Sequence, residues 1–580
     1  MRGRRHEDDD TMTWIHPLSA EVEESAEVLG GKAHGLVVLR RLGLPVPPGF
    51  VITTQACRAF FGSGRLPSGL ESELADAVAG LEASTDRRLG GTARPLTVSV
   101  RSGASVSMPG MMSTVLNLGL TTAATTALAE ETGDLRFALE SRLRFLSGFA
   151  SEVLGVGREA LAAVDRAIAG QGSDSARPMS DADRLDAHTD MDTDRFTEAV
   201  RGVEQLIRQR GGAPVPEDAI RQLELAIAAV FSSWHTPRAK TYRELHAIAH
   251  DLGTAVTVQA MVYGNRGRHS GTGVAFSRDP NTGERVPFGE VLFGRQGEDV
   301  VSGRSPTRPL HQLADREPAV WAGLLDALDR LEEHYRDACY VEFTFEEGEL
   351  WVLQVRPGRF VGRAAVRVAV DLADAGTIGR DEAILRVSPQ LLQHVRTPRI
   401  ALDDAQDVFT RGLGACPGVA VGRVATTADG AARLAAQGPV VLVRPETSPL
   451  DMHGLAAAAG VVTARGGPAS HAAVVARAMG KPAVVGAANL TVEEGVGVRA
   501  GDRTLPEGAL IAIDGTGGEV VVGDPPVVST TTDPQLHRLL TWADEITGHA
   551  SDGDEARRLT SARTALLRRQ GAAGSARRVS

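Results

Sequence analysis

Short apolar runs with the two-residue period of β-strands recur along most of the chain, separated by glycine, proline and acidic turns. The clearest pair lies from Tyr340 to Arg356, where β-forming residues alternate with polar ones on both sides of a Glu-Glu-Gly turn. This pattern predicts a β-hairpin. Further strands are predicted at 96–100, 255–262 and 271–276, and in the later runs VVLV, GVVT, AVVG, ALIAID and EVVVG.

A helical period, with apolar residues three and four positions apart, replaces the strand pattern between residues 122 and 245. The acidic stretch at 180–196 is poor in large apolar residues, and its carboxylates lack the glycine and glutamate positions of a calcium loop. We therefore expect a solvated loop there. Residues 366–408 also have helical character, with Ser388-Pro389 as a helix start. Together these regions predict a multidomain α/β (α+β) protein.

Composition narrows the class of protein. The chain has 580 residues, 42% hydrophobic and 23% charged, which predicts about three or four domains. The formal net charge of −11 disfavours general nucleic-acid binding. The charged N-terminus lacks the apolar core of a signal peptide, and Cys57, Cys339 and Cys416 are too far apart for a C-x-x-C metal site. These features predict a cytoplasmic protein that binds no nucleic acid and no membrane.

One histidine begins a short helix-compatible run in the segment 465–486, which reads RGGPASHAAVVARAMGKPAVVG. Ser470 is a suitable N-cap, and Gly480 followed by Pro482 is typical of a helix end. The free N–H groups and positive dipole end of such a helix attract anions, so His471 lies where a phosphoryl group would be stabilised. The alternative is a histidine that merely begins a helix.

Two basic residues lie beside glycine-containing turns in the N-terminal part. Lys32 follows Gly30 and Gly31, where a flexible backbone can approach a phosphate and the lysine adds positive charge. Arg101 ends an alternating strand before a loop that contains Gly110, and its planar guanidinium can pair two phosphate oxygens. Taken alone, each basic residue has a solvated surface side chain as its alternative.

The segment around His471 resembles the phosphohistidine motif of the PEP-utilising enzymes, the pyruvate phosphate dikinase family. In that family the histidine of GG-x-x-S-H-A-A-V-V-A-R carries phosphate between two distant active sites. The motifs GGK, V-S-V-R-S-G and S-M-P-G-M-M are similar to the family's ATP-grasp domain. SRDPNTGE and GEVLFGRQGEDVVSG are also close to family patterns, and the resemblance extends over residues 15–545.

The resemblance implies a role for each matching residue of the first motifs. His471 would be the catalytic phosphoryl carrier. Lys32 and Arg101 would bind the phosphates of ATP, with Gly110 and Met112 in the loop over them.

In the predicted hairpin, Glu342, Gln354 and Arg356 fall at same-face or near-face positions of adjacent strands, although a solvated sheet face is the alternative. The resemblance implies that Glu342 binds Mg²⁺ and that Gln354 and Arg356 contact ATP. Tyr340 departs from the family pattern D-I-E-F. Because tyrosine cannot replace a carboxylate as a ligand of Mg²⁺, metal binding would depend on another carboxylate such as Asp337.

The fold implied by the resemblance is an ATP-grasp nucleotide-binding domain with a helical subdomain, followed by a swivelling β/β/α phosphohistidine domain. We expect a disordered extension at 1–14, ATP-grasp parts at 15–121 and 246–365, a helical subdomain at 122–245, a helical linker at 366–408, the phosphohistidine domain at 409–524, and a linker remnant and tail at 525–580. The family's C-terminal TIM barrel needs about 250 residues, so we expect none in this chain.

These features predict a phosphotransferase in which ATP and phosphate phosphorylate His471, with release of AMP and pyrophosphate. Final transfer to pyruvate, giving PEP, would need a separate protein that carries the barrel, and the resemblance leaves a homodimer open. One alternative is a non-catalytic nucleotide-binding regulator or degenerate half-enzyme, which Tyr340 favours. The other is a rifampicin-type phosphotransferase, whose large drug-binding domain does not fit into residues 366–408.

Overall fold

The computed structural model describes residues 13–106, 108, 112–157, 160–161, 189–210, 213–245, 247–302, 307–358, 360–392, 395, 398–401, 407–468, 470–529, 533–548 and 554–576. The chain divides into two compact units, Met1–Val262 and Tyr263–Ser580. Most of the extension predicted at 1–14 lies outside the described residues, but the Trp14 backbone N–H donates to Glu73 Oε2 at 2.8 Å, so the ordered chain begins before residue 15.

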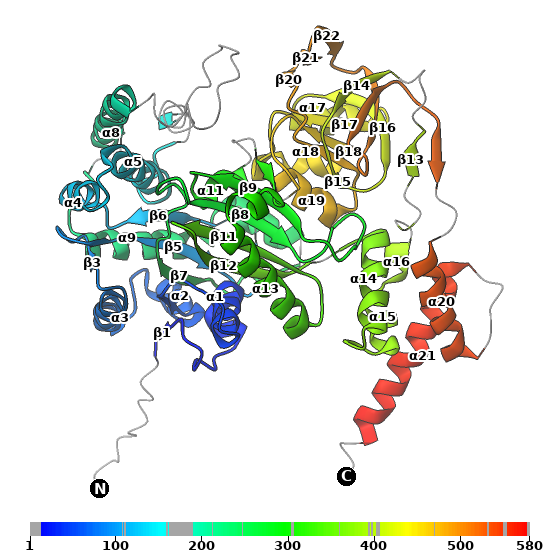
Figure 1. Cartoon of the computed structure of the whole chain (residues 1–580), viewed down its shortest axis with the longest axis horizontal. Coiled ribbons are helices and arrows are strands. Elements are labelled where there is room, and N and C mark those ends of the chain that lie inside the picture. The colour runs from blue at the N-terminus through cyan, green and yellow to red at the C-terminus, as the bar shows by residue number, and fades with distance from the viewer. Residues whose placement is uncertain are drawn as a thin grey trace. The chain divides into compact units, whose positions relative to one another are not determined.

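The first unit contains an antiparallel five-stranded sheet in the order β1-β2-β7-β5-β6 (Figure 1). Its strands are β1 (Ile15–Pro17), β2 (Gly49–Ile52), β5 (Val98–Gly103), β6 (Thr114–Leu118) and β7 (Ala255–Ala260), and a short parallel pair is formed by β3 (Arg88–Leu89) and β4 (Pro95–Leu96). Strand β7 comes from the far end of the unit's sequence and lies between β2 and β5. Helices pack on this sheet, which buries most positions of β5 and β7: α1 (Ala26–Arg41), α2 (Thr54–Ser63), α3 (Leu70–Thr85) and α9 (Ala219–Ser233).

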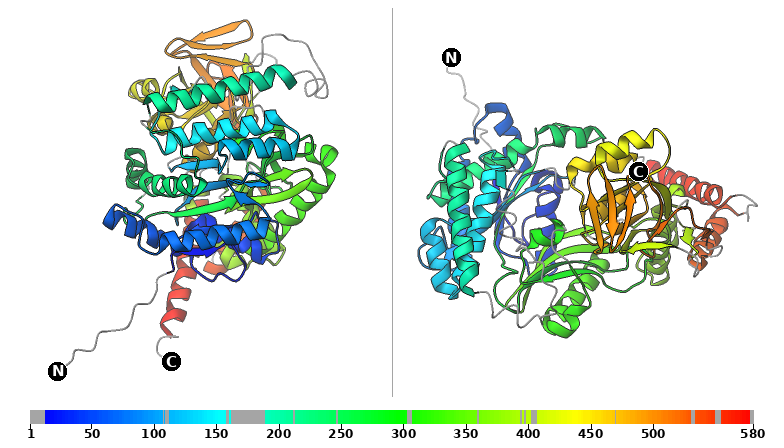
Figure 2. Two further views of the ribbon diagram at one scale, coloured as in Figure 1. Left: turned by 90° about the vertical axis from the view of Figure 1, so that its left-hand side faces the viewer. Right: turned by 90° about the horizontal axis from the view of Figure 1, so that it is seen from above.

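The helical part of the first unit consists of α4 (Thr122–Thr132), α5 (Leu135–Glu152), α8 (Thr189–Arg210) and α10 (Pro237–Leu245). Helices α5 and α8 lie side by side (Figure 2). The loop predicted at 180–196 is wrong in its last part, because α8 begins at Thr189. Phe196 and Val203 are seven residues apart, so they lie on one face of the helix, and both are buried. Packing of this apolar face stabilises the helix despite its acidic start.

The second unit begins with an antiparallel sheet in the order β10-β9-β8-β11-β12. Its elements are β8 (Gly271–Phe276), β9 (Phe288–Phe293), α11 (Gly297–Ser302), β10 (Arg308–Pro309), α12 (Gln312–Arg316), α13 (Pro318–Tyr335), β11 (Cys339–Glu346) and β12 (Glu349–Pro357). The predicted hairpin is confirmed: β11 and β12 are joined by a turn in which Glu347 and Gly348 have φ of 51° and 84°. Helix α13 packs on β11 and β12 through Leu324, Leu328 and neighbouring apolar residues.

A helical layer follows the sheet and also receives the C-terminal segment. It contains α14 (Gly362–Asp374), α15 (Arg380–Arg386), α16 (Pro389–Leu392), α20 (Pro534–Thr547) and α21 (Glu555–Ala576). Asp533 caps α20 and Pro534 is its first residue, as predicted. The tail predicted at 525–580 differs, because Leu559, Ala562 and Leu566 of α21 are buried in a common core with α14 and α20. Burial of this apolar face explains why an Arg- and Ala-rich segment forms a packed helix.

The region around His471 contains an eight-stranded sheet in the order β14-β24-β23-β16-β17-β18-β19-β15. The strands are β14 (Val408–Arg411), β15 (Leu413–Cys416), β16 (Val419–Ala425), β17 (Val440–Arg444), β18 (Gly460–Thr463), β19 (Ala483–Val485), β23 (Leu510–Asp514) and β24 (Glu519–Val522). The predicted strand runs are therefore confirmed. A three-stranded sheet of β20 (Leu490–Glu493), β21 (Gly497–Ala500) and β22 (Arg503–Pro506) is attached, and the helical elements are α17 (Ala428–Ala435), η1 (Pro449–Asp451), α18 (Met452–Ala457) and α19 (His471–Met479).

The chain enters and leaves this region through two paired strands. Strand β13 (Pro398–Ile400) pairs antiparallel with β25 (Val527–Ser529). The buried Asp514 carboxylate accepts from the Arg399 Nε at 2.8 Å and from the Ile400 N–H at 3.0 Å. The linker predicted at 366–408 is thus helical only in part, because β13 lies within it.

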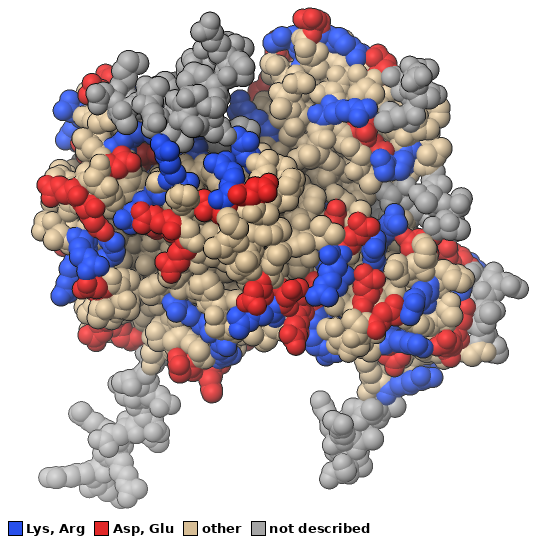
Figure 3. Space-filling view, in the orientation of Figure 1, with Lys and Arg blue, Asp and Glu red and all other residues tan. Residues whose placement is uncertain are grey.

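Basic and acidic side chains are interspersed over the face drawn in Figure 3. None of the described helices has the length and apolar character that a membrane crossing requires. Within the described ranges, no sheet closes into a (β/α)₈ barrel. The domain boundaries expected from the sequence stay a prediction.

Candidate functional site

Helix α19 begins at His471, in the loop that follows β18. Ser470 occupies the N-cap position with extended backbone angles, as predicted, but its side chain makes no capping hydrogen bond. Its hydroxyl oxygen is buried and has no hydrogen-bond partner within the described part of the chain. The N–H groups of the first turn therefore donate no hydrogen bond to the Ser470 side chain, and they can bind an anion. Gly480 ends the helix with φ of 63°, which confirms the predicted stop.

The His471 imidazole has one hydrogen-bond contact, because its Nδ1 lies 3.1 Å from Thr447 Oγ1. Burial lowers the pKa of His471, although the Asp451 carboxylate opposes this shift. A lowered pKa makes the neutral imidazole the main form at pH 7. Neutral imidazole is the nucleophilic form.

Thr447 lies in the loop between β17 and η1, which a capping box holds in place. The Ser448 hydroxyl accepts from the Leu450 N–H, and the Asp451 carboxylate accepts from the Ser448 N–H at 2.8 Å. Arg444 Nε lies 3.4 Å from Asp451 Oδ1. Sequence reasoning missed Thr447, although the Ser-Pro-x-Asp pattern after it is the signature of a capped turn.

The three hairpin residues do meet on one face of the β9-β8-β11-β12 sheet. Glu342 lies directly opposite Gln354, and Tyr340 lies opposite Arg356. Arg356 Nη2 is 3.4 Å from Glu342 Oε1. In the amide orientation that satisfies both groups, the Gln354 side-chain oxygen accepts from the Arg356 guanidinium. The Arg356 guanidinium thus contacts both Glu342 and Gln354, as expected for a site that binds charged oxygens.

Glu290 is a residue of this face that the sequence reading did not select. It lies opposite Val274 in β8, and Val274 lies opposite Glu342 in β11. Glu290 is 3% exposed, and Thr307 Oγ1 donates a hydrogen bond to its carboxylate. A row of Glu290, Val274, Glu342 and Gln354 therefore crosses four strands. The alternating pattern of 288–293 places Glu290 on one face of its strand, but only strand order brings it beside Glu342.

Tyr340 is the position where the family pattern has a carboxylate. Its ring packs 4.9 Å from the Phe276 ring, and the Arg356 guanidinium carbon lies 5.8 Å from the ring centre of Tyr340. Burial raises the pKa of its phenol, with Glu342 acting in the same direction and Arg356 opposing. The phenol is therefore protonated at neutral pH and provides no anionic ligand.

Asp337 does not take over the role of the family carboxylate in this structure. Its Oδ1 accepts from the Ala338 N–H at 2.8 Å and lies 3.8 Å from Arg386 of α15. In the residues that the structure describes, no group of three or more potential ligands could hold a metal ion. Glu342 and Glu290 fit Mg²⁺ in the common mode in which one or two carboxylates bind it together with phosphate oxygens and water.

Lys32 and Arg101 belong to the first unit, where glycine contacts bring their chain segments together. The predicted turn at Gly30 is confirmed as a kink in α1, with φ of 74°, and the Gly31 N–H donates to the Ala104 carbonyl at 3.0 Å. A side chain on Gly30 would overlap the Gly103 carbonyl, so only glycine permits this approach. Lys32 therefore lies beside the end of β5, the strand that contains Arg101.

The predicted loop over the nucleotide is described in part. Gly110 lies outside the described residues. Met112 is half-buried and packs on a cluster that contains Trp234 and Met108. The Ser233 hydroxyl lies 3.8 Å from its sulfur. Met112 thus anchors one end of the loop to α9.

Two family models match the chain. Residues 26–77 and 61–321 match the pyruvate phosphate dikinase AMP/ATP-binding domain, and residues 436–518 match the PEP-utilising enzyme mobile domain. The second match includes His471. The chain belongs to the pyruvate phosphate dikinase family. The resemblance found in the motifs is confirmed.

Curated relatives carry the same family name. Pyruvate, phosphate dikinase of Rhizobium meliloti (strain 1021) is 41% identical over 550 residues, which is 92% of this chain and 60% of the relative. Pyruvate, phosphate dikinase 2 of Zea mays is 42% identical over 525 residues, which is 90% of this chain and 58% of the relative. Pyruvate, phosphate dikinase of Clostridium symbiosum is 38% identical over 538 residues, which is 92% of this chain and 60% of the relative. The chain thus spans 58–60% of the length of these dikinases, which are kinase-type transferases.

Proposed function

We propose that this chain is an ATP-dependent phosphotransferase of the pyruvate phosphate dikinase type, with His471 as its phosphoryl carrier. The observation that carries the proposal is the place of His471 at the first turn of α19, where burial lowers the pKa of its imidazole and Nδ1 lies 3.1 Å from Thr447 Oγ1. A nucleophile beside free helix N–H groups is suited to hold a phosphoryl group.

The nucleotide half of the proposal is an ATP-grasp site. In the first unit, Lys32 and Arg101 are the residues proposed to bind phosphate oxygens of ATP. In the second unit, Arg356, which Gln354 orients, is proposed for the same role. Gly110 and Met112 belong to the loop over the nucleotide. Glu342, with Glu290 on the same face, would hold Mg²⁺, and the ion would supply positive charge that offsets the negative charge of the phosphates.

The His471 side chain carries out two displacements in this scheme. Nδ1 lies 3.1 Å from Thr447 Oγ1, and the scheme assigns the ring proton to Nδ1, which leaves the lone pair on Nε2. Nε2 attacks the β-phosphorus of ATP, and AMP leaves with the electron pair of the bond to the α–β bridging oxygen. Phosphate then attacks the γ-phosphorus, the β–γ bridge breaks, and pyrophosphate leaves phospho-His471 behind. Positioned cations stabilise the charge that builds on the oxygens.

Transfer from phospho-His471 to pyruvate, giving PEP, is assigned to a barrel carried by a separate protein. ATP and phosphate are thus the direct partners proposed here, and pyruvate and PEP are reached through that protein. We propose a cytoplasmic location and leave a homodimer as a further expectation. The domain boundaries predicted from the sequence belong to this proposal.

A second function, a nucleotide-binding regulator without transfer activity, is favoured by one observation. Tyr340 stands on the same face as Glu342 and supplies no carboxylate for Mg²⁺. In that case ATP binds but His471 receives no phosphate. A rifampicin-type acceptor has no such observation in its favour.

The test is incubation of the chain with Mg²⁺, phosphate and ATP labelled at the β position, followed by peptide mapping and AMP measurement. We expect acid-labile label on His471 and release of AMP. His471→Asn should lose all label and still bind ATP, because it removes the nucleophile and retains the fold. His453→Asn is the matched control, since that exposed histidine pairs with Asp429 and lies outside the proposed site.

Label retained in His471→Asn would overturn the carrier assignment. ATP binding without label in the unmodified chain would establish the regulator instead. Binding is therefore measured in the same samples by calorimetry.

A further inference from the structure

Arg444, the last residue of β17, has no role in the proposed function, although its side chain is only 17% exposed. A mostly buried guanidinium needs partners for its charge and for its N–H groups. Its Nη1 donates to the Thr426 carbonyl at 2.9 Å and to Glu494 Oε1 at 2.7 Å. Its Nε lies 3.4 Å from Asp451 Oδ1. Arg444 therefore joins the turn before α18 to a different part of the region.

The Thr426 side of this network is a firm support. Thr426 follows β16 and is fully buried, and its hydroxyl donates to Glu507 and accepts from the Gly495 N–H at 2.7 Å. These bonds connect β16 to the turn between β20 and β21, which also contains Glu494. Because Glu494 is exposed, water screens its charge, and the bond to the Thr426 carbonyl is the better anchor for Arg444.

On the other side of the network, Asp451 uses its two carboxylate oxygens for different partners. Oδ2 accepts from the Ser448 N–H at 2.8 Å and from the Ser448 hydroxyl at 3.0 Å, whereas Oδ1 faces Arg444. Asp451 is 7% exposed, and within the residues that the structure describes Arg444 is the cation paired with it. Thr447 directly precedes Ser448, and its hydroxyl lies 3.1 Å from His471 Nδ1. A path of contacts thus leads from Arg444 through Asp451 to the imidazole.

The same path affects the charge of the imidazole. Burial lowers the pKa of His471, and the Asp451 carboxylate opposes this shift because a negative charge favours the protonated ring. Arg444 offsets part of that negative charge. Loss of Arg444 would therefore favour the imidazolium form, which has no lone pair with which to attack phosphorus.

Other ionisable groups near His471 have partners of their own. Strands β15, β18 and β19, all described in full, pack on α19 and carry no acidic or basic side chain, and burial raises the pKa of the Cys416 thiol to about 11. The groups on α18, on α19 and in the adjoining loops have these partners: His453 has Asp429, Arg465 has Glu446, Glu290 beside Gly467 has Thr307, and Arg477 and Lys481 have backbone carbonyls. Asp451 is the carboxylate that acts on the pKa of His471.

We propose that Arg444 is a positioning residue for the carrier histidine, which pairs with Asp451, fixes the turn 447–451, and so keeps the Thr447 hydroxyl on Nδ1 and Nε2 free. The transfer step rests on the proposed function, whereas the hold on the imidazole does not. Because the effect passes through Asp451, His471 should become insensitive to Arg444 once the Asp451 carboxylate is removed.

The test is an NMR titration of the full chain containing histidine labelled with ¹³C in the imidazole ring. The chemical shift of Cε1 follows protonation, and that of Cδ2 distinguishes the two tautomers. Among the 15 histidines, the His471 signal is the one that is lost in His471→Asn. Transfer of label from ATP to His471 is measured over the same pH range.

Arg444→Met should raise the pKa of His471, and a second tautomer should appear because the turn is no longer fixed. Labelling of His471 at about pH 6 should fall by roughly three- to tenfold and recover toward about pH 8, where the imidazole is neutral with or without Arg444. Asp451→Asn should shift the titration in the opposite direction, since it removes the negative charge and keeps an oxygen for the Ser448 N–H. Arg444→Met added to Asp451→Asn should cause no further shift.

Two variants of Arg444 itself sharpen the test. Arg444→Lys retains a charge that can pair with Asp451, so it should restore most of the titration and of the labelling. Arg444→Gln removes the charge and keeps an amide donor for the Thr426 carbonyl. It therefore carries the same expectation as Arg444→Met and serves where Arg444→Met fails to fold.

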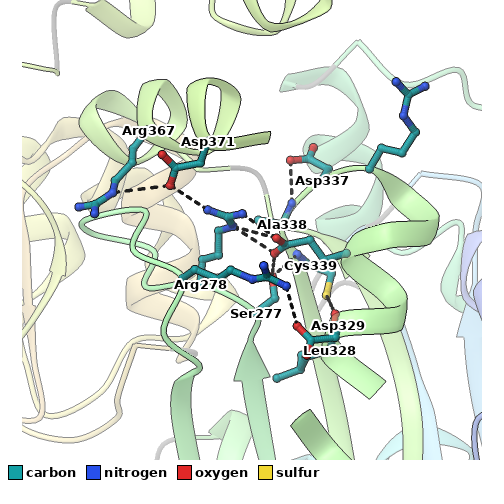
Figure 4. A network of polar contacts seen from close by, with 12 residues as sticks. Ser277, Arg278, Leu328, Asp329, Asp337, Ala338, Cys339, Arg367 and Asp371 are labelled. Carbon is teal, nitrogen blue, oxygen red and sulfur yellow. Dashed lines mark hydrogen bonds and ion pairs between the residues drawn. The ribbon is translucent and has the colours of Figure 1, made fainter. Parts of the chain in front are cut away.

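The matched control is Arg367→Met. Arg367 of α14 also has two carboxylate partners, Glu284 at 2.9 Å and Asp371 at 3.8 Å, and neither belongs to the turn 447–451. Figure 4 shows Arg367 and Asp371 pointing toward one another, in a network that also contains Arg278. Loss of this ion pair should leave the titration and the tautomer of His471 unchanged.

An unchanged titration and tautomer in Arg444→Met and Arg444→Gln would overturn the role of Arg444. A shift that persists when Arg444→Met is added to Asp451→Asn would also overturn it, because the effect would then bypass the turn. The expected shifts in a chain that never labels His471 would support the role of Arg444 and reject the phosphotransferase. The two proposals therefore fail on different measurements.

Discussion

The His471 region and the Glu342 face are built in opposite ways. Most of the His471 site comes from one continuous stretch, 465–486, to which the fold adds Thr447 from a neighbouring loop. The Glu342 face is assembled from four strands, and its row of Glu290, Val274, Glu342 and Gln354 exists only because β9 pairs with β8 and β8 with β11. The comparison teaches that the proposed carrier site is local, whereas the proposed nucleotide site is spread through a sheet.

The two regions also differ in charge. Burial lowers the pKa of His471, whose Nδ1 contacts the Thr447 hydroxyl, whereas the Arg356 guanidinium is paired with Glu342 and Gln354. We therefore expect changes in the sheet face to weaken ATP binding and transfer together. Changes in the His471 region should weaken transfer alone.

The largest effect is expected from Arg356→Met. The change removes the cation that contacts Glu342 and Gln354, so kcat/KM for AMP release should fall by about a hundredfold or more, and ATP binding should weaken. The measurement is steady-state AMP formation with calorimetric binding. Arg285→Met is the control, because Arg285 forms an exposed pair with Asp329. Normal ATP affinity in Arg356→Met would break the comparison.

A smaller effect is expected from Thr447→Val, which keeps the shape of the side chain and removes its hydroxyl. Without the bond to Nδ1 the imidazole can adopt either tautomer, so labelling of His471 should slow by roughly tenfold while ATP binding stays constant. Rapid-quench labelling measures the rate. Thr491→Val, on exposed strand surface, is the control. Weaker ATP binding in Thr447→Val would show that the two regions are not separable.

The smallest effect is expected from Tyr340→Asp, which adds a carboxylate on the same face as Glu342. The Mg²⁺ concentration for half-maximal AMP release should fall severalfold, since one more hard oxygen ligand is present. Tyr340→Phe should leave that concentration unchanged, because neither a phenol nor a phenyl ring binds Mg²⁺. Equal magnesium dependence in the two variants would show that position 340 does not face the metal.

Much of the local architecture could be predicted from the sequence. The β11–β12 hairpin follows from its alternation and its Glu-Glu-Gly turn, and the limits of α19 follow from Ser470 and Gly480. The start of α8 was missed, and only a frayed helix or a disordered end was expected where α21 forms, because the composition of these stretches is acidic or Arg-rich. Their helices are stabilised by distant apolar partners, which periodicity in a short window does not show.

The residues of the candidate site also divide into those selected from the sequence and those that were missed. The sequence reading selected His471, Glu342, Gln354 and Arg356 from spacing and motif, and the structure places the last three on one face of the sheet. Thr447 and Glu290 were missed because each reaches its partner through tertiary contact, across 24 residues in the first case. The sequence could not predict that the Ser470 side chain makes no capping hydrogen bond, since a serine at the N-cap position is compatible with either outcome.

The sequence by itself determined the hairpin, the helix that begins at His471 and the family to which the chain belongs, because each depends on residues close together in the chain. Only the tertiary structure decided which strands became neighbours, which carboxylates share a face, and that Thr447 meets His471. Strand order and such contacts depend on burial of surfaces contributed by distant residues, and the residues that form such surfaces do not reveal one another by their spacing.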